Sequence, residues 1–556
     1  MLVYPLAANS RPDFSQANPQ QALAVRQISE SIISCSLKGG SLQGPAGSGK
    51  TTVLGWIADR VYAECGPNRI LFAAPTHKAK RVLGHGLNLG LKTKVVTVAS
   101  LIGVKTSMDF DKENFDSPEY KEVIKKAESF RKSNRSVRAI FIDESSMIAQ
   151  NVADKLELFA AECLSSIWFC GDAYQLPPVD NDEESDEELF GQQEDLLFGN
   201  MCGQFVSSQG DRYALISVAR HSGPILDFAS NMRANWRNHL DFPVKDVSSK
   251  NSYIEVFGSE NHWIECLCSL IRKYRTRARA VCYRNDTVDR VGARVRESLY
   301  GEESLRGWLP GELVLIPKYI KPVHYDPKSN SLRYSREPGE DRARALYACT
   351  ECEIQDVEFF EIDLKIDFYS TLTARSGIQN FPVELRGRYQ QLTVVPLDAE
   401  NMQPFKMLVP AMDCNIAAEN YKTVKATRKR FVSNKWINTK KEKGFGMSLK
   451  KFNDCHPLIR PINVMTVHSS QGSTFDYVFA HNDMRNAPKD VRKPLIYVSA
   501  TRAKKGAYFY NRDLAQLSQQ HPQSSEQYQQ SHQPSQRNPS RLADAGLPDL
   551  SWFSLQ

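Results

Sequence analysis

Two short segments of this 556-residue chain contain the residue types that phosphate chemistry requires. The first is glycine-rich and ends in a lysine and a threonine, Gly44-Pro45-Ala46-Gly47-Ser48-Gly49-Lys50-Thr51. It fits the pattern G-x-x-x-x-G-K-[ST], in which backbone N–H groups close around phosphate oxygens and the lysine reaches the β- and γ-phosphates. We therefore predict a nucleoside-triphosphate site formed by Gly44, Pro45, Ala46, Gly47, Ser48, Gly49, Lys50, Thr51 and Thr52.

The second segment is an apolar run, residues 138–142, that stops at the adjacent carboxylates Asp143 and Glu144. Its β-favouring residues predict a short buried strand. A carboxylate at the end of such a strand can hold Mg²⁺ together with the Thr51 hydroxyl, and its neighbour can orient or deprotonate an attacking water. We expect Thr51 and Asp143 to bind Mg²⁺, and Lys50 and Glu144 to act in the hydrolysis of ATP.

Both segments need elements that hold them at one edge of a sheet. Residues 51–58 read as a helix, which would place phosphate at a helix N-terminus. Apolar runs at 69–74, 139–142 and 166–170 alternate with helical patterns and predict a parallel sheet with its ligand at the carboxyl ends of the strands. A second α/β block is expected from strand-like runs at 278–283, 464–467, 476–480 and 495–498, interrupted by β-like alternation at 391–396 and 405–410.

Length and composition limit the class of protein. Single cores stop growing near ~250 to 300 residues, so this chain should hold several domains. No stretch approaches the ~18 to 20 apolar residues of a membrane span, and residues 1–5 do not open a secretory signal. The 12 cysteines are scattered, which excludes a disulfide scaffold. We expect a cytoplasmic protein without membrane contact.

Charge is distributed unevenly around a net value of +7. Residues 421–451 hold many lysines and arginines and one acid, Glu442, a density that suits a phosphate backbone and equally suits a solvated helix face. Residues 180–195 are strongly acidic and are expected to form a surface loop. Residues 518–540 consist mainly of Gln, Ser, His and Pro, which predicts a disordered tail.

A third segment, Gly171-Asp172-Ala173-Tyr174-Gln175-Leu176-Pro177-Pro178-Val179, completes a set of motifs. With the phosphate loop and Asp143-Glu144-Ser145-Ser146, it resembles motifs I, II and III of the superfamily 1 helicases. Its Leu-Pro-Pro-Val ending is similar to the B branch, which holds the Dda-like and RecD-like 5′–3′ DNA helicases. Residues 466–476 likewise resemble motif V, and residues 497–503 resemble motif VI.

The resemblance implies roles for residues outside the phosphate loop. Gln21 is similar to the glutamine of the family that reads adenine, and Gly472, in the motif V segment, is implied to bind the nucleotide. Gln175, Arg220 and Arg502 are implied to be catalytic, although Arg220 precedes His221 where the family has glutamine. We expect Arg502 just beyond an apolar strand, as an arginine finger for the γ-phosphate. Contacts to nucleic acid are implied for Thr76, His77, Lys78, Thr97, Ser100, Thr466 and His468.

The resemblance also implies an α/β architecture with two RecA-like P-loop motor domains. Residues 1–215 would form the first, with a small pin insertion at about 104–136, where Phe110 and Phe115 either stack on bases or anchor a loop. Residues 216–320 and 455–512 would form the second. Residues 321–454 would be an inserted accessory domain containing a β-barrel, and residues 513–556 the tail.

The implied activity is ATP-dependent 5′–3′ translocation on single-stranded DNA and unwinding of fork or tailed duplex DNA, in replication, recombination or repair. We expect a monomeric motor, with a single-strand-binding or replisome protein as the candidate partner of the tail. Two alternatives stay open: an RNA-directed helicase, since phosphate contacts alone do not distinguish the sugars, and a nucleic-acid-binding scaffold with vestigial ATPase motifs. The intact Lys50, Asp143, Glu144 and Arg502 argue against the scaffold.

Overall fold

The computed structural model describes residues 12–87, 95–103, 105–108, 113–116, 119–134, 136–177, 210–218, 222–236, 242–335, 345–347, 349–366, 383–397, 404–413, 415–416, 419–424, 426 and 451–514. Arg220 and Phe110 lie outside these residues, as do the acidic segment 180–195, most of the basic run and the tail. Within the described residues, no helix combines the length and the apolar character needed to cross a membrane.

The N-terminal part is a six-stranded sheet in the order β3-β2-β6-β7-β1-β8, and its paired strands are parallel. The strands are β1 (Gly40–Gln43), β2 (Ile70–Ala74), β3 (Val95–Thr97), β6 (Ala139–Ile142), β7 (Ser166–Gly171) and β8 (Asp211–Ala214). The strands expected at 69–74, 139–142 and 166–170 are confirmed, together with their parallel direction.

Two apolar layers cover this sheet. The helices are α1 (Pro19–Ile33), α2 (Lys50–Cys65), α3 (His77–Leu87), α4 (Val98–Ile102), α5 (Tyr120–Ser133) and α6 (Gln150–Glu162). Residues of α1, α2 and α3 pack on one face, and residues of α4, α5 and α6 pack on the other. Every residue of β6 is therefore buried between the two layers. The acidic pair, Asp143 and Glu144, directly follows the carboxyl end of this buried strand.

The second α/β part has a six-stranded sheet in the order β19-β11-β20-β21-β10-β9. Its strands are β9 (Val247–Ser248), β10 (Tyr253–Phe257), β11 (Ala278–Cys282), β19 (Val464–Thr466), β20 (Phe475–Ala480) and β21 (Ala503–Tyr510). The pairs are parallel except for β9 with β10. Its helices include α8 (Pro224–Ala234), α9 (Glu260–Tyr274), α10 (Asn285–Tyr300), α14 (Val467–Ser470) and α15 (Lys489–Thr501).

One expectation about this part is wrong. The run Leu495 to Val498 was expected to be a strand, but it lies within helix α15, and the strand β21 follows it. Leu495, Ile496, Tyr497 and Val498 are all fully buried, so the helix is apolar on every side in this stretch. A short, fully buried apolar run has no periodicity that separates a helix from a strand.

An antiparallel sheet interrupts the second part, in the order β17-β16-β15-β12-β18. Its strands are β12 (Leu313–Ile316), β15 (Thr350–Ile366), β16 (Val383–Pro396), β17 (Phe405–Pro410) and β18 (Arg460–Pro461). The hairpin of β13 (Val323–Asp326) and β14 (Ser331–Tyr334) accompanies it. The alternation at 391–396 and 405–410 thus lies in strands, as expected, whereas β12 and β18 extend the sheet beyond residues 321–454.

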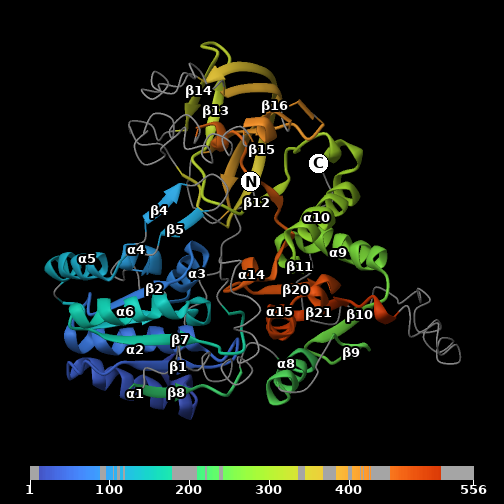
Figure 1. The fold of residues 1–556 in the computed structure, drawn as a ribbon. Coiled ribbons are helices and arrows are strands. Elements are labelled where there is room, and N and C mark those ends of the chain that lie inside the picture. Colours follow the sequence, from blue (N-terminus) through green and yellow to red (C-terminus); the bar gives the residue numbers. More distant parts are fainter. Residues whose placement is uncertain are drawn as a thin grey trace, which may run out of the picture.

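Figure 1 shows the two α/β parts side by side and the inserted sheet above them. A backbone hairpin of β4 (Lys105–Met108) and β5 (Glu113–Asp116) extends from the first part toward the inserted sheet (Figure 1). Phe115 belongs to β5.

His456 gives the inserted part a predictable pH dependence. Its ring stacks on Tyr421 at 4.7 Å, Nδ1 donates to the Phe452 carbonyl (2.8 Å), and Nε2 accepts from the Tyr389 hydroxyl (2.9 Å). Burial lowers the pKa of His456 to about 4, so the folded protein excludes a proton that the unfolded chain binds below pH ~6.5. We expect the free energy of local unfolding to fall by about 3 kcal/mol between pH ~6.5 and ~4.

Hydrogen-exchange protection of β16 and β17, corrected for the intrinsic exchange rate, measures this change. His456→Gln should flatten the pH dependence, whereas substitution of the exposed His262 should not. Equal slopes in the wild type and His456→Gln would contradict the assignment.

Candidate active site

The phosphate loop joins the end of β1 to the start of α2. Gly47 and Gly49 have φ angles of 84° and 86°, a region that side chains other than glycine rarely adopt. A Cβ on Gly49 would also lie 2.6 Å from the Gln21 amide nitrogen. Lys50 Nζ donates to the carbonyl oxygens of Gly44 (2.7 Å) and Pro45 (3.2 Å). The loop backbone therefore accepts hydrogen bonds from the lysine that ends the loop. This lysine is the first residue of the 16-residue helix α2, so the loop lies at a helix N-terminus.

Gln21 is attached to this loop. Its Nε2 donates to the Ser48 carbonyl (3.0 Å), and its Oε1 accepts from the Asn18 backbone (3.1 Å) in the cap of α1. Both ends of the amide thus have protein partners, and in this arrangement the side chain supports the loop. The neighbouring Gln20 accepts a hydrogen bond from the Ile216 backbone (2.8 Å), which ties α1 to the segment after β8.

The acidic pair follows β6 directly. Asp143 is 9% exposed, and burial together with the neighbouring Glu144 charge raises its pKa to about 7, against the opposing effect of Lys50. Glu144 adopts a left-handed backbone conformation with a φ of 51°. A buried carboxylate with a raised pKa is suited to a divalent cation, whose charge offsets the cost of burial. With the Thr51 hydroxyl on the adjacent helix start, the oxygen donors fit Mg²⁺.

Arg502 reaches this site from the second sheet. It ends helix α15, is 2% exposed, and donates from Nη1 to the Ser473 carbonyl (3.1 Å). Burial lowers the pKa of its guanidinium, and the negative charge of Glu144 acts in the opposite direction. The Glu144 carboxylate also lies near Gly472 in the loop before β20. Motifs II, V and VI therefore meet although their sheets are separate. The expectation that Arg502 follows a strand is wrong, since it follows a helix.

Several buried polar atoms of the motif segments have no hydrogen-bond partner among the described residues. They come from all five motif segments: Ser48 Oγ, Glu144 Oε2, Ser146 Oγ, Gln175 Oε1, Gln471 Nε2 and Arg502 Nε. A buried polar group without a partner costs about 1–3 kcal/mol. Unpartnered donors and acceptors in the motif segments are typical of a site that a polar ligand completes.

A second contact between the two α/β parts lies beside Gln175, at residues to which the sequence assigns no role. Asp172 accepts from Arg233 (2.8 Å) of α8 and from the Tyr497 hydroxyl (2.8 Å) of α15. The Arg233 guanidinium also lies over the Tyr174 ring at 4.3 Å. Asp172 belongs to the motif III segment, but Arg233 lies in a helix without a motif, so no sequence signal pointed to it.

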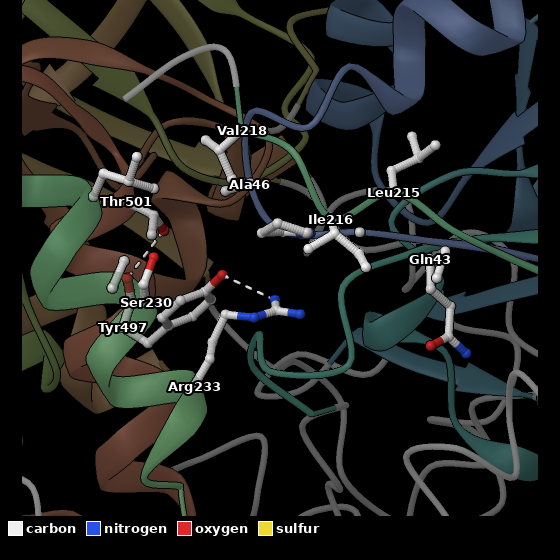
Figure 2. Close-up of a pocket in the computed structure, with 14 residues that line it drawn as sticks. Gln43, Ala46, Leu215, Ile216, Val218, Ser230, Arg233, Tyr497 and Thr501 are labelled. Carbon is white, nitrogen blue, oxygen red and sulfur yellow. Dashed lines mark hydrogen bonds between the residues drawn. The ribbon is translucent and has the colours of Figure 1, made fainter. Parts of the chain in front are cut away.

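A cavity of about 280 Å³ separates the phosphate loop from α8 and α15. In Figure 2, Arg233 and Tyr497 point toward each other on one side, and Leu215 and Ile216 lie on the other. Its lining includes Gly44, Pro45, Ala46 and Thr501. The cavity therefore extends from the phosphate loop to Thr501, the residue that precedes Arg502.

The residues expected to contact nucleic acid lie at helix starts. Thr76, Thr97 and Thr466 each accept a backbone N–H three residues further on, at 3.0, 3.2 and 3.2 Å, and so cap α3, α4 and α14. Lys78 Nζ donates to the Ser469 carbonyl (2.7 Å), which joins the first part to motif V. Burial lowers the pKa of His468. Ser100 lies in α4, close to the carboxyl end of β3.

One group of metal-type ligands occurs elsewhere in the described residues, at Cys282, His481 and Asp483. His481 is already engaged, because Nε2 pairs with Glu260 (2.7 Å) and Nδ1 accepts from the Asp483 backbone (3.0 Å). Asp483 in turn accepts from the backbones of Tyr283 and Arg284. This group is a satisfied network that fixes the ends of β11 and β20.

Comparisons with known proteins agree with the motif set. Residues 16–187 match the family model of an AAA domain, and residues 461–510 match that of a UvrD-like helicase C-terminal domain. An uncharacterised protein of Acanthamoeba polyphaga mimivirus is 22% identical over 516 residues, covering 87% of this chain and 98% of the relative. The ATP-dependent DNA helicase dda of Enterobacteria phage T4 is 20% identical over 488 residues, covering 84% and 93%.

Among solved structures, the Pif1 helicase from Candida albicans is similar with a TM-score of 0.42 and 14% identity, covering 91% of this chain and 99% of that one. Pif1 from Bacteroides, in complex with ADP-AlF3 and single-stranded DNA, has a TM-score of 0.39 and 15% identity, covering 90% and 97%. The ordered motifs, the two family models and the phage relative together support a superfamily 1 helicase of the B branch.

Proposed function

We propose that this chain is an ATP-driven helicase that moves 5′ to 3′ along single-stranded DNA and unwinds fork or tailed duplex DNA. The observation that carries the proposal is the meeting of Glu144, from the first sheet, with Arg502, from the second. A nucleotide held by the phosphate loop would contact both α/β parts, so its binding would draw them together and its hydrolysis would release them.

The proposed roles at the nucleotide follow from the donors that each residue offers. Lys50 and the loop amides hold the phosphates of ATP, and Thr51 and Asp143 hold Mg²⁺, which would supply charge neutralisation at the phosphates. Glu144 positions and deprotonates the attacking water. Gln175 and Arg502 bind the γ-phosphate, and Arg220 is proposed as a second arginine there. Gln21 is proposed to turn from Ser48 to adenine.

The proposed path of the strand crosses the helix starts that Thr76, Thr97 and Thr466 cap. Their hydroxyls are used in capping, so we propose that the adjacent backbone N–H groups and Ser100 grip phosphates. Because backbone contacts carry no sequence information, stepping would be independent of sequence. The proposed 5′–3′ direction rests on the resemblance to the B branch.

The proposed division of the chain gives one sheet to each domain, except that β12 and β18 of the inserted sheet lie in the segments assigned to the second motor domain. Residues 1–215 form the first RecA-like motor domain, residues 216–320 and 455–512 form the second, and residues 321–454 form the accessory domain. The β4–β5 hairpin is the proposed pin, with Phe110 or Phe115 stacking against the base pair that opens. The protein is proposed to act as a monomer, with the tail, residues 513–556, docking a single-strand-binding or replisome protein.

Hydrolysis of ATP in the presence of DNA and RNA oligonucleotides tests the proposal. We expect single-stranded DNA to stimulate hydrolysis, and Lys50→Ala to lower the stimulated rate by about 10²- to 10³-fold, because one preorganised charge at the phosphates is lost. Substitution of Lys38, which is paired with Asp211 at the surface, is the matched control and should leave the rate unchanged. If RNA alone stimulated hydrolysis, the substrate of the motor would be RNA and not DNA. An absence of hydrolysis would contradict the proposal.

A further inference from the structure

The first turn of α3 meets the inserted sheet through an aromatic cluster that includes two residues without a role so far. His77 stacks on Tyr347, with ring centroids 4.6 Å apart and planes at 28°. Tyr319 packs beside Tyr347 at 5.8 Å. We call His77, Tyr319 and Tyr347 the junction cluster. It joins the first α/β part to the inserted part.

The backbone directs the two tyrosines outward. Ile320 and Leu346 form an antiparallel bridge with reciprocal N–H···O bonds of 3.0 and 2.9 Å, and both side chains are buried in the inserted core. In an extended chain, consecutive side chains point to opposite faces, so Tyr319 and Tyr347 lie side by side on the outer face. Tyr319 is 37% exposed and Tyr347 is 49% exposed.

Basic residues flank the cluster in the sequence, although the buried Asp454 also acts on Tyr319. Lys80 and Arg81 follow His77 in α3, and Lys318 precedes Tyr319. Glu351, an acid at the start of β15 that acts on Arg81, is paired with Arg279 at 3.2 Å. Burial, with Lys80 and Arg81, lowers the pKa of His77, so its ring is neutral at physiological pH. Exposed aromatic rings flanked by basic residues favour a polyanion that carries flat bases over an acidic peptide.

The cluster also lies beside the residues proposed to hold the strand. Thr76, which caps α3, immediately precedes His77. Lys78, the next residue, bonds to Ser469 of motif V. Arg81, one turn further on, donates to the Cys349 carbonyl (3.0 Å) in the inserted part. One helical turn therefore contacts motif V on one side and the inserted sheet on the other.

We propose that the junction cluster is a base-stacking site for single-stranded nucleic acid, in which Tyr347 and Tyr319 present their rings to bases and His77 supports Tyr347 from behind. The proposal rests on the proposed function, because it places bases beside a backbone path that belongs to that function. It implies that the bases of the bound strand turn toward the inserted sheet while the phosphates face the helix starts of the two α/β parts.

Equilibrium binding of the full-length protein to two fluorescent oligonucleotides tests this site. One is oligothymidine, and the other is a strand of equal length and charge made of abasic residues. We expect Tyr347→Ala to weaken binding of oligothymidine by about 5- to 150-fold, the range for loss of one stacked base, and to leave binding of the abasic strand unchanged. Tyr319→Ala should act in the same direction, and Tyr347→Phe should restore wild-type affinity.

Tyr300→Ala is the matched control, since Tyr300 is 39% exposed but lies at the end of α10. Tyr319 does not contact α3 through a ring, so its variant tests stacking without disturbing the His77 contact. Equal weakening for the oligothymidine and abasic strands, or no weakening by either alanine variant, would overturn the stacking site while the wild type still binds DNA. A wild-type protein that binds neither strand would overturn the proposed function itself.

Discussion

Replacing Arg502 with alanine is expected to lower the rate constant for ATP hydrolysis by about 10³- to 10⁵-fold, the contribution of an arginine that stabilises charge on a transferring phosphoryl group. The side chain is 2% exposed and its Nε has no partner among the described residues, so the guanidinium is held in place with one donor available. ATP binding by the phosphate loop should persist, because Lys50 and the loop amides belong to the other sheet. Single-turnover hydrolysis and nucleotide binding, measured separately, check this prediction.

Arg502→Lys distinguishes loss of charge from loss of shape. Lysine keeps the charge but cannot reproduce the planar donor geometry, so it should recover folding and little of the rate. Arg277→Ala removes an exposed arginine of the same α/β part and should leave hydrolysis unchanged. If Arg502→Ala hydrolyses ATP at the wild-type rate, the arginine finger is assigned wrongly.

Glu144→Gln is expected to lower hydrolysis by about 10²- to 10⁴-fold, the contribution of a positioned general base. The amide has the shape of the carboxylate but cannot take a proton from water. The substitution also removes the like charge that helps to raise the pKa of Asp143, so the proton at Asp143 competes less with a cation. We therefore expect nucleotide and Mg²⁺ to bind at least as tightly as in the wild type.

Trapping of the bound nucleotide gives the clearest measurement. Incubation with radiolabelled ATP and Mg²⁺ should leave intact ATP on Glu144→Gln and ADP on the wild type. Glu162→Gln, at the end of α6, is the control and should turn over normally. Rapid ADP formation by Glu144→Gln would move the role of base to another residue.

The sequence predicts the parts of the fold that repeat local patterns. The apolar runs that end at Asp143 and Gly171 are strands because they are short, β-favouring and buried. In the phosphate loop, Gly47 and Gly49 have positive φ angles, which glycine adopts readily. The same reasoning predicted a strand for Leu495 to Val498, which is wrong because these residues lie in helix α15. A helix buried between two parts of the protein is apolar on all sides, so its sequence has no amphipathic period.

Contacts between distant segments were harder to foresee. Asp172 accepts hydrogen bonds from Arg233 and Tyr497, which lie 61 and 325 positions further along the chain. Tyr347 stacks on His77 only because the inserted sheet folds back over α3. Such pairs depend on how complete parts dock, and neither partner has a spacing that predicts the other. The motif resemblance predicts roles for Glu144 and Arg502, and the structure brings these two residues together.

The most direct test of the proposed function is strand separation on two partial duplexes, one with a 5′ single-stranded tail and one with a 3′ tail, in the presence of ATP and Mg²⁺. We predict unwinding of the 5′-tailed duplex alone, with no product from Glu144→Gln under the same conditions. Unwinding from the 3′ tail alone would contradict the proposed direction, and failure on both duplexes would contradict helicase activity.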